Sequence, residues 1–144
     1  MILTVSGWRE WRDLGFVVYH LDRYHRTFGD LMFWRVGCAR GLDKMVREFL
    51  VNRRVPDTNF TVYRADWDGL DKAAGMIRNG QMLRGENPRD HFPGVLTDRL
   101  LAFPEPGLRW KTARSGTVGC ILDAASLGVY LDVPGYRITT EERK

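Results

Sequence analysis

The chain has 144 residues, of which 22 are Lys or Arg and 18 are Asp or Glu, so its formal net charge is +4. With 44% apolar and 28% charged residues, the composition predicts one globular domain and excludes a disordered chain, and the apolar runs are too short to cross a bilayer. Two cysteines cannot build a disulfide scaffold, and the three histidines show no zinc-like spacing. We therefore expect a cytoplasmic protein without a metal or other cofactor.

Short apolar runs, typical of strands covered on both faces, alternate with segments of helical periodicity. The predicted strands are 2–5, 31–34, 60–63, 100–103 and 129–131. The predicted helices between them are 14–28, 42–50, 70–83 and 118–125. This alternation predicts an α/β fold, a Rossmann-like three-layer sandwich with a mostly parallel five-stranded sheet. We expect one domain over residues 1–138 and a frayed tail over 139–144.

Ligands of such a sheet bind beyond the carboxyl ends of its strands, where the N–H groups of helix starts point outward. Segments that fall at this edge combine small residues with hydroxyl groups or cations, and arginine binds phosphate oxygens well. They predict an anionic ligand, although glycines there are also ordinary turn residues. The candidate ligand-binding residues are Ser6, Gly7, Arg9, Gly37, Cys38, Ala39, Arg40, Gly41, Asp66, Trp67, Lys72, Arg78, Asn79, Ser115, Gly116 and Thr117.

Several of these residues have a structural alternative. The Arg78-Asn79 pair either binds a ligand or joins a helix to a loop through hydrogen bonds. Trp67 either stacks on a base or fills the core, and the hydroxyl groups of Ser6, Ser115 and Thr117 contact phosphate or cap helices.

The same segments resemble a known family. Residues 37–43 are similar to a GGARGAD loop, and residues 65–67 followed by 72–83 are similar to an ADW…KAAGPIRNxxML signature. These motifs are those of the YspA-related branch of the SLOG superfamily, which includes the Lonely Guy enzymes and the DNA-processing protein DprA. Residues 6–11, similar to GSRxW, and 102–117, similar to AFPGGxGT, extend the resemblance over nearly the whole chain. It implies a Rossmann-like fold, a homodimer or larger assembly, and a pocket for a nucleotide or nucleotide-derived ligand.

The sequence also departs from the family pattern. Lonely Guy enzymes carry catalytic carboxylates just after the last Gly-Thr, whereas Val118, Gly119 and Cys120 follow it here. Trp8 replaces a small hydroxyl residue and Cys38 replaces a glycine, which changes the floor of the expected pocket. In the lengthened final loop, residues 108–111 either close over a base or pack on a neighbouring subunit.

Three functions follow from these residues. The leading hypothesis is a module that senses or sequesters a nucleotide or nucleotide derivative, with Arg40, Asp66, Arg78 and Thr117 around one hollow. The second is a hydrolase of N-glycosidic or phosphate-ester bonds, with Asp66 as the best candidate for a catalytic base. The third is a DNA-binding module, which the basic charge allows. Cys38 has no histidine placed to act as its base.

Overall fold

The computed structural model describes residues 1–66, 73–107 and 116–135. All strands within these ranges form one five-stranded sheet of order β3-β2-β1-β4-β5, and every pairing is parallel. The strands are β1 (Ile2–Gly7), β2 (Phe33–Gly37), β3 (Phe60–Tyr63), β4 (Arg99–Phe103) and β5 (Tyr130–Asp132). The predicted fold class is therefore confirmed, and the sheet is wholly parallel.

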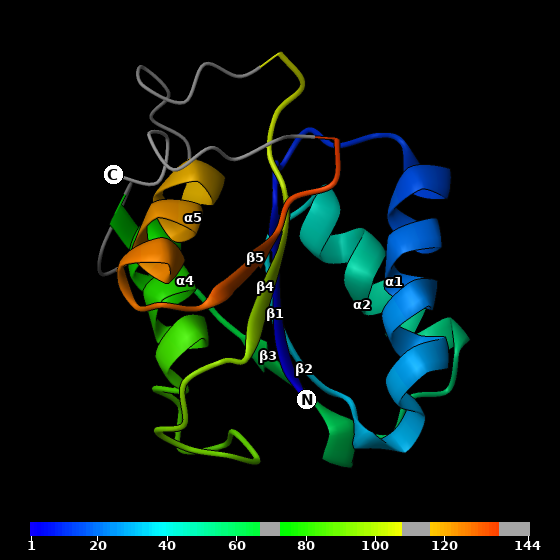
Figure 1. Ribbon diagram of the computed structural model, residues 1–144, viewed down its shortest axis with the longest axis horizontal. Helices are drawn as coiled ribbons and strands as arrows, with labels where there is room; N and C mark the ends of the chain where they lie inside the picture. Colours follow the sequence, from blue (N-terminus) through cyan, green and yellow to red (C-terminus); the bar gives the residue numbers. More distant parts are fainter. Residues whose placement is uncertain (67–72, 108–115, 136–144) are drawn as a thin grey trace.

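Helices cover both faces of this sheet (Figure 1). Helices α1 (Leu14–Phe28) and α2 (Leu42–Asn52) pack on one face, and α4 (Ala74–Arg84) and α5 (Gly116–Ser126) pack on the other. Short 3-10 turns, η1 (Gly29–Leu31) and η2 (Asp57–Asn59), lead into β2 and β3. No helix within the described ranges is long and apolar enough to cross a membrane. The predicted tail at 139–144 lies outside the described residues.

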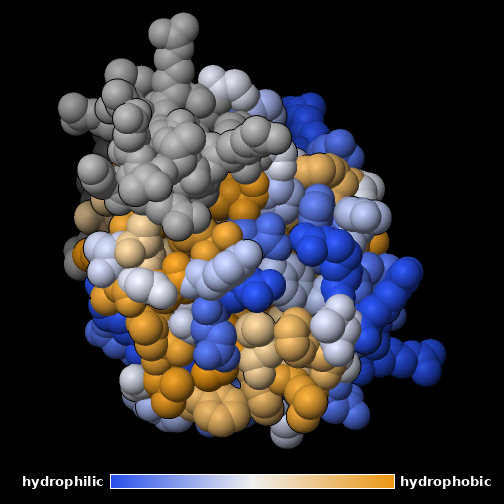
Figure 2. Space-filling view, in the orientation of Figure 1, coloured by the Kyte–Doolittle hydropathy of each residue, from blue (hydrophilic) through white to orange (hydrophobic). Residues whose placement is uncertain are grey.

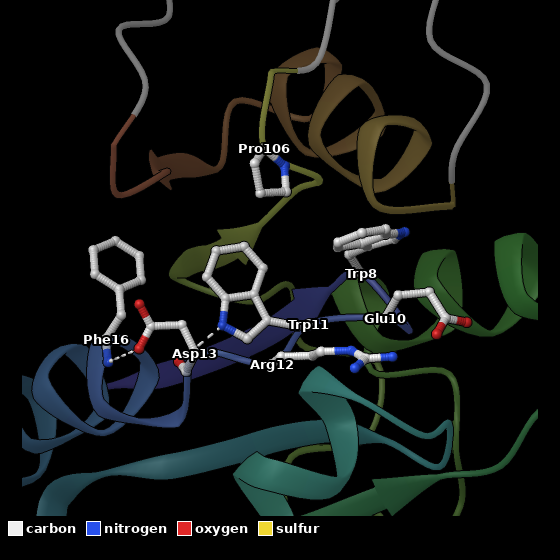
Figure 3. Close-up of a pocket in the computed structure, with 7 residues that line it drawn as sticks. All are labelled: Trp8, Glu10, Trp11, Arg12, Asp13, Phe16 and Pro106. Atoms are coloured by element: carbon white, nitrogen blue, oxygen red, sulfur yellow. Dashed lines mark hydrogen bonds between the residues drawn. The ribbon is translucent and has the colours of Figure 1, made fainter.

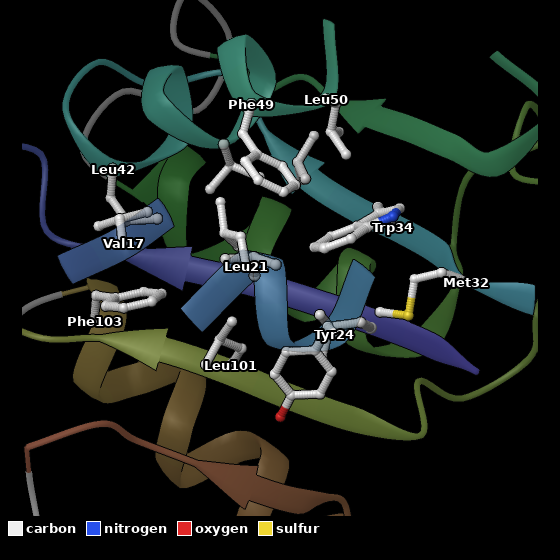
Figure 4. Packing of buried hydrophobic residues seen from close by; sticks show 14 residues of the cluster. Val17, Leu21, Tyr24, Met32, Trp34, Leu42, Phe49, Leu50, Leu101 and Phe103 are labelled. Carbon is white, nitrogen blue, oxygen red and sulfur yellow. The ribbon is translucent and has the colours of Figure 1, made fainter. Parts of the chain in front are cut away.

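The larger part of the hydrophobic core lies between the sheet and the helices α1 and α2. Val17 and Leu21 of α1 are fully buried against Trp34 and Leu101 of the sheet (Figure 4). A smaller cluster lies under α5, around Leu100. Burying apolar surface is the main free-energy term that stabilises the sandwich, at roughly 25 cal/mol per Å².

Strand β2 begins and ends later than the sequence predicts. The apolar run 31–34 predicts a strand that stops before Arg35, but β2 continues to Gly37, and Leu31 lies in η1 with 71% of its surface exposed. The strand continues because Arg35, only 1% exposed, is neutralised inside the protein. Its Nε and Nη2 donate to the two carboxylate oxygens of Asp90, at 3.0 and 3.3 Å.

The Arg35–Asp90 pair attaches the long 84–94 loop to the sheet. Tyr63 of β3 donates a hydrogen bond to the same carboxylate, and Arg35 also donates to the carbonyl oxygens of Met82 and Phe92. Burial alone would raise the pKa of Asp90, but the hydrogen bonds from Tyr63, from the Phe92 amide and from Arg35 outweigh it, and the pKa is lowered. The stabilisation from Asp90 is therefore present at neutral pH and is lost as the pH falls through that lowered pKa.

We predict that Asp90→Asn will lower the free energy of unfolding by about 3–5 kcal/mol, because it leaves the Arg35 cation buried without its counter-charge. Urea denaturation at neutral pH measures this change. Glu48→Gln is the matched control: Glu48 forms an exposed helical ion pair with Lys44, so its loss is expected to cost less than about 0.5 kcal/mol. Equal effects of the two substitutions would contradict the prediction.

Candidate ligand-binding site at the carboxyl edge of the sheet

A cavity of about 380 Å³ opens where the carboxyl ends of β1 and β4 lie side by side. The chain leaves β1 toward one face of the sheet and β4 toward the other, which is where ligands of open parallel sheets bind. This hollow, the edge cavity, is lined by Ser6, Gly7, Trp8, Arg9, Glu10, Ala39, Gly75, Met76, Arg78, Asn79, Glu105, Gly116 and Thr117.

The first turns of two helices open into the edge cavity. Gly75 and Met76 belong to the first turn of α4, and Gly116 and Thr117 belong to that of α5. Neither first turn contains an acidic residue, and no side chain among the described residues caps the start of α4. The backbone N–H groups of a helix start lack partners within the helix and carry partial positive charge, so both helix ends favour a negative group in the cavity.

Arg78 forms part of the cavity floor and is held in place. Only 5% of the residue is exposed, and its Nε donates to Asn79 Oδ1 at 2.9 Å. Its Nη1 lies 3.4 Å from Asp43 Oδ2 and 3.7 Å from Cys38 Sγ. Burial raises the pKa of Asp43, whereas the charge of Arg78 and the Ala39 amide act in the opposite direction. Hydrogen bonds and an ion pair therefore hold the Arg78 cation in place, and the carboxylate of Asp43 partly balances its charge.

Two glycines of the 37–41 loop permit this arrangement. A Cβ on Gly37 would lie 2.3 Å from both Arg78 Nη1 and Asp43 Oδ2, so the ion pair rests directly on the backbone of β2. Gly41 has a φ of +68°, and a Cβ there would lie 2.0 Å from the carbonyl oxygen of Arg9. The absence of a side chain on Gly37 thus lets the ion pair lie against the strand, and its absence on Gly41 lets the backbone of Arg9 lie against the 37–41 loop.

The structure brings part of the predicted site together. The candidate residues that line the edge cavity are Ser6, Gly7, Arg9, Ala39, Arg78, Asn79, Gly116 and Thr117. The candidates that lie behind or beside it are Gly37, Cys38 and Gly41. Trp67, Lys72 and Ser115 lie outside the described residues, as do residues 108–111.

Arg40 and Asp66 do not line the edge cavity. Of the four residues expected around one hollow, only Arg78 and Thr117 therefore lie there. The Arg40 side chain is 72% exposed and forms an ion pair with Glu10 at 2.5 Å, and of these two residues only Glu10 lines the cavity. Asp66 is exposed beyond the end of β3, the strand at the far edge of the sheet. In the sheet, β2 separates β3 from β1, the nearer of the two strands whose ends open into the cavity.

Five residues that line the cavity are not among the candidate residues predicted from the sequence: Trp8, Glu10, Gly75, Met76 and Glu105. From the sequence, Trp8 is expected at the floor of the pocket because it departs from the family motif there, but it is not among the residues assigned to ligand binding. Gly75 and Met76 fall in a second turn if the helix is taken to begin near residue 70, whereas α4 begins at Ala74 and places them at its start. Glu10 has the exposed Arg40 as a partner, a pairing that no local spacing indicates.

Among the described residues, the cysteines and acidic residues form no group of the kind that holds a metal ion. Burial raises the pKa of Cys120 to about 12, so this thiol stays protonated at neutral pH. Cys38 accepts a hydrogen bond from the Ala65 amide at 3.2 Å and packs against Arg78. Within the described ranges, no three His, Cys, Asp or Glu residues are grouped as metal ligands are.

The fold and the edge cavity define a doubly wound α/β protein with a small-molecule-sized hollow at the topological switch point of its sheet. Over 131 residues the chain is 31% identical to the "Gene 61 protein" of Mycobacterium phage D29, an alignment that covers 88% of this chain and 90% of the relative. The chain belongs to the family of that phage protein. No family model and no solved structure matches this chain. Its function must therefore be argued from the site.

We predict that Gly37→Ala will destabilise the fold by about 1–3 kcal/mol, because the new methyl group forces the Arg78 and Asp43 side chains apart in a packed region. Thermal and urea unfolding measure the change. Gly119→Ala is the matched control: its Cβ would meet only the end of Met76 at 3.6 Å, and alanine favours a helix over glycine by up to about 1 kcal/mol. A Gly37→Ala protein as stable as the control would contradict the prediction.

Proposed function

We propose that this protein binds a nucleotide or nucleotide-derived ligand in the edge cavity, with phosphate at the starts of α4 and α5, and acts as a sensor or sequestering module. The observation that carries the proposal is the convergence of two helix N-termini, free of acidic residues in their first turns, on a cavity that also holds Arg9 and Arg78. Such N-termini bind phosphate through backbone N–H groups and the helix dipole. We also propose membership of the YspA-related branch of the SLOG superfamily, supported by the similarity of residues 6–11, 37–43, 65–67, 72–83 and 102–117 to the motifs of that branch.

The size and composition of the edge cavity support a small phosphorylated ligand. Its volume of about 380 Å³ falls in the range of about 300–1,000 Å³ typical of small-molecule sites. Gly7 and Gly116 both lie along its wall, and a Cβ on Gly7 would collide with the side chain of Leu42. Arg78 needs no reorientation on binding because Asn79 and Asp43 already hold its guanidinium group.

The positions of the acidic residues favour binding over hydrolysis. Asp66, the best candidate for a catalytic base, lies outside the lining of the edge cavity. The carboxylates that line it are Glu10 and Glu105, and Arg40 pairs with Glu10 and lowers its pKa through a hydrogen bond and its charge. A general base acts best with a pKa near the working pH, which is the opposite of this shift.

Two further properties belong to the proposal. We infer self-association, supported by exposed apolar side chains on the α4 and α5 layer, where Ile77 and Leu122 are each 42% exposed. Figure 2 shows hydrophobic surface gathered on the α5 and β5 side of the molecule, whereas the α1 side is mostly hydrophilic.

We also infer a reducing, cytoplasmic compartment, which suits two free thiols.

A thermal-shift screen tests the proposal. We expect at least one phosphate-bearing nucleotide, at about 100 times its dissociation constant, to raise the free energy of unfolding by roughly 2.7 kcal/mol. The panel contains nucleoside mono-, di- and triphosphates, pyrophosphate and the matching free nucleosides. No shift with any phosphorylated compound at millimolar concentration would overturn the proposal.

Substitution of Met76 provides a sharper test, because this side chain is 60% exposed and lies in the first turn of α4 at the cavity. We expect Met76→Glu to weaken binding of the screened nucleotide about tenfold or more, since a carboxylate there competes for the helix end and repels phosphate. Met76→Gln, of the same length but neutral, is expected to bind like the wild type. Isothermal titration calorimetry measures both. Equal affinity of the two variants would place the phosphate elsewhere.

A further inference from the structure

A second cavity, of about 640 Å³, lies beside the edge cavity, next to the start of α1. Trp8, Trp11, Phe16 and Pro106 supply its apolar wall, and we call it the aromatic pocket (Figure 3). The two cavities share Trp8 and Glu10, in the segment that directly follows β1. They are therefore adjacent compartments that meet at these two residues.

The wall of the aromatic pocket around Trp11 is rigid. Trp11 stacks on Phe16 with ring centroids 5.8 Å apart and meets Phe103 edge-on at 5.6 Å. Its Nε1 donates to the carbonyl oxygen of Asp13 at 3.0 Å, and Asp13 Oδ1 caps α1 by accepting from the Phe16 amide at 3.1 Å (Figure 3). The surface that Trp11 presents is thus formed before any ligand binds, which lowers the entropic cost of binding.

Trp8 differs from Trp11 in that its backbone is fixed by hydrogen bonds, while no aromatic ring or cation of the described residues contacts its ring. Its N–H donates to Phe103 O at 3.0 Å, and its carbonyl oxygen accepts from Trp11 and Leu42 amides at 3.2 and 3.3 Å. The half-buried indole ring stacks on no aromatic ring and covers no cation within the described ranges. An aromatic face in this state, at the boundary of two cavities, is available to stack on a planar ligand group.

The charges of the two compartments differ. Glu10 and Asp13 place carboxylates at the aromatic pocket, against the single cation of Arg12, and the rest of its wall is apolar. This environment disfavours phosphate and suits a neutral planar group whose N–H donors can reach a carboxylate. The edge cavity also contains two carboxylates, Glu10 and Glu105, but there they lie with two arginines, Arg9 and Arg78, and the starts of α4 and α5 open into the cavity, which favours phosphate.

On the basis of the proposed function, we propose that the aromatic pocket holds the base of the bound nucleotide, stacked on Trp8, while the phosphate lies across Trp8 in the edge cavity. The ligand then crosses the loop after β1 with its base toward α1 and its phosphate toward α4 and α5. Trp8 is the residue that selects a ligand with a base over a simple sugar phosphate.

Isothermal titration calorimetry of the full chain tests this assignment with AMP, GMP, CMP and UMP, each compared with ribose 5-phosphate, which has the same phosphate but no base. We expect the best nucleotide to bind roughly 5- to 150-fold more tightly than ribose 5-phosphate, the range that one stacked base contributes. Trp8→Leu is expected to remove this advantage, so that no nucleotide binds more tightly to the variant than ribose 5-phosphate does, whereas Trp8→Phe retains most of it. Tyr19→Leu, which removes an exposed aromatic ring of α1 outside the pocket, is the control and is expected to change neither affinity.

The outcomes separate this inference from the proposed function. Equal affinities of wild-type protein for ribose 5-phosphate and all four nucleotides would overturn the base site and leave the phosphate site standing, and this comparison does not depend on any variant folding. Binding of a free nucleoside without any response to ribose 5-phosphate would overturn the phosphate site and support the base site. No binding of any of these compounds would overturn both.

Discussion

The ion pair between Arg78 and Asp43 is the interaction on which the geometry of the edge cavity depends. Asp43 lies in the first turn of α2 and Arg78 in α4, and these helices cover opposite faces of the sheet. The two side chains meet just beyond the end of β2, over the bare backbone of Gly37. The pair therefore connects the two helical layers around the end of a strand. Removing one partner would leave a buried charge without compensation, which is strongly unfavourable.

A second buried ion pair performs a different task. Arg35 and Asp90 attach the 84–94 loop to the middle of the sheet, and Tyr63 joins them. This network lies away from the edge cavity and contributes to the fold rather than to the site. The molecule thus buries charge for two purposes, to anchor a long connection and to position a cation where a ligand can meet it.

The fold was largely predictable from the sequence because it depends on apolar periodicity, which is a local property. Topology alone then places the ends of β1 and β4 together, so Ser6 and Thr117 could be assigned to one edge without coordinates. The errors arise from long-range electrostatics. Arg35 extends β2 because Asp90, distant in sequence, neutralises it, and Arg40 pairs with Glu10 and does not itself line the cavity. No local pattern contains these partners.

The contact between Gly37 and the ion pair also constrains how this family can diverge. A side chain at position 37 and a salt bridge between residues 43 and 78 exclude each other, since both need the same space. Relatives that retain the pair are expected to retain the glycine, and relatives that lose the charge at one position are expected to lose it at the other. The three positions should therefore change together among descendants of a common ancestor, even though Gly37 carries no functional group of its own.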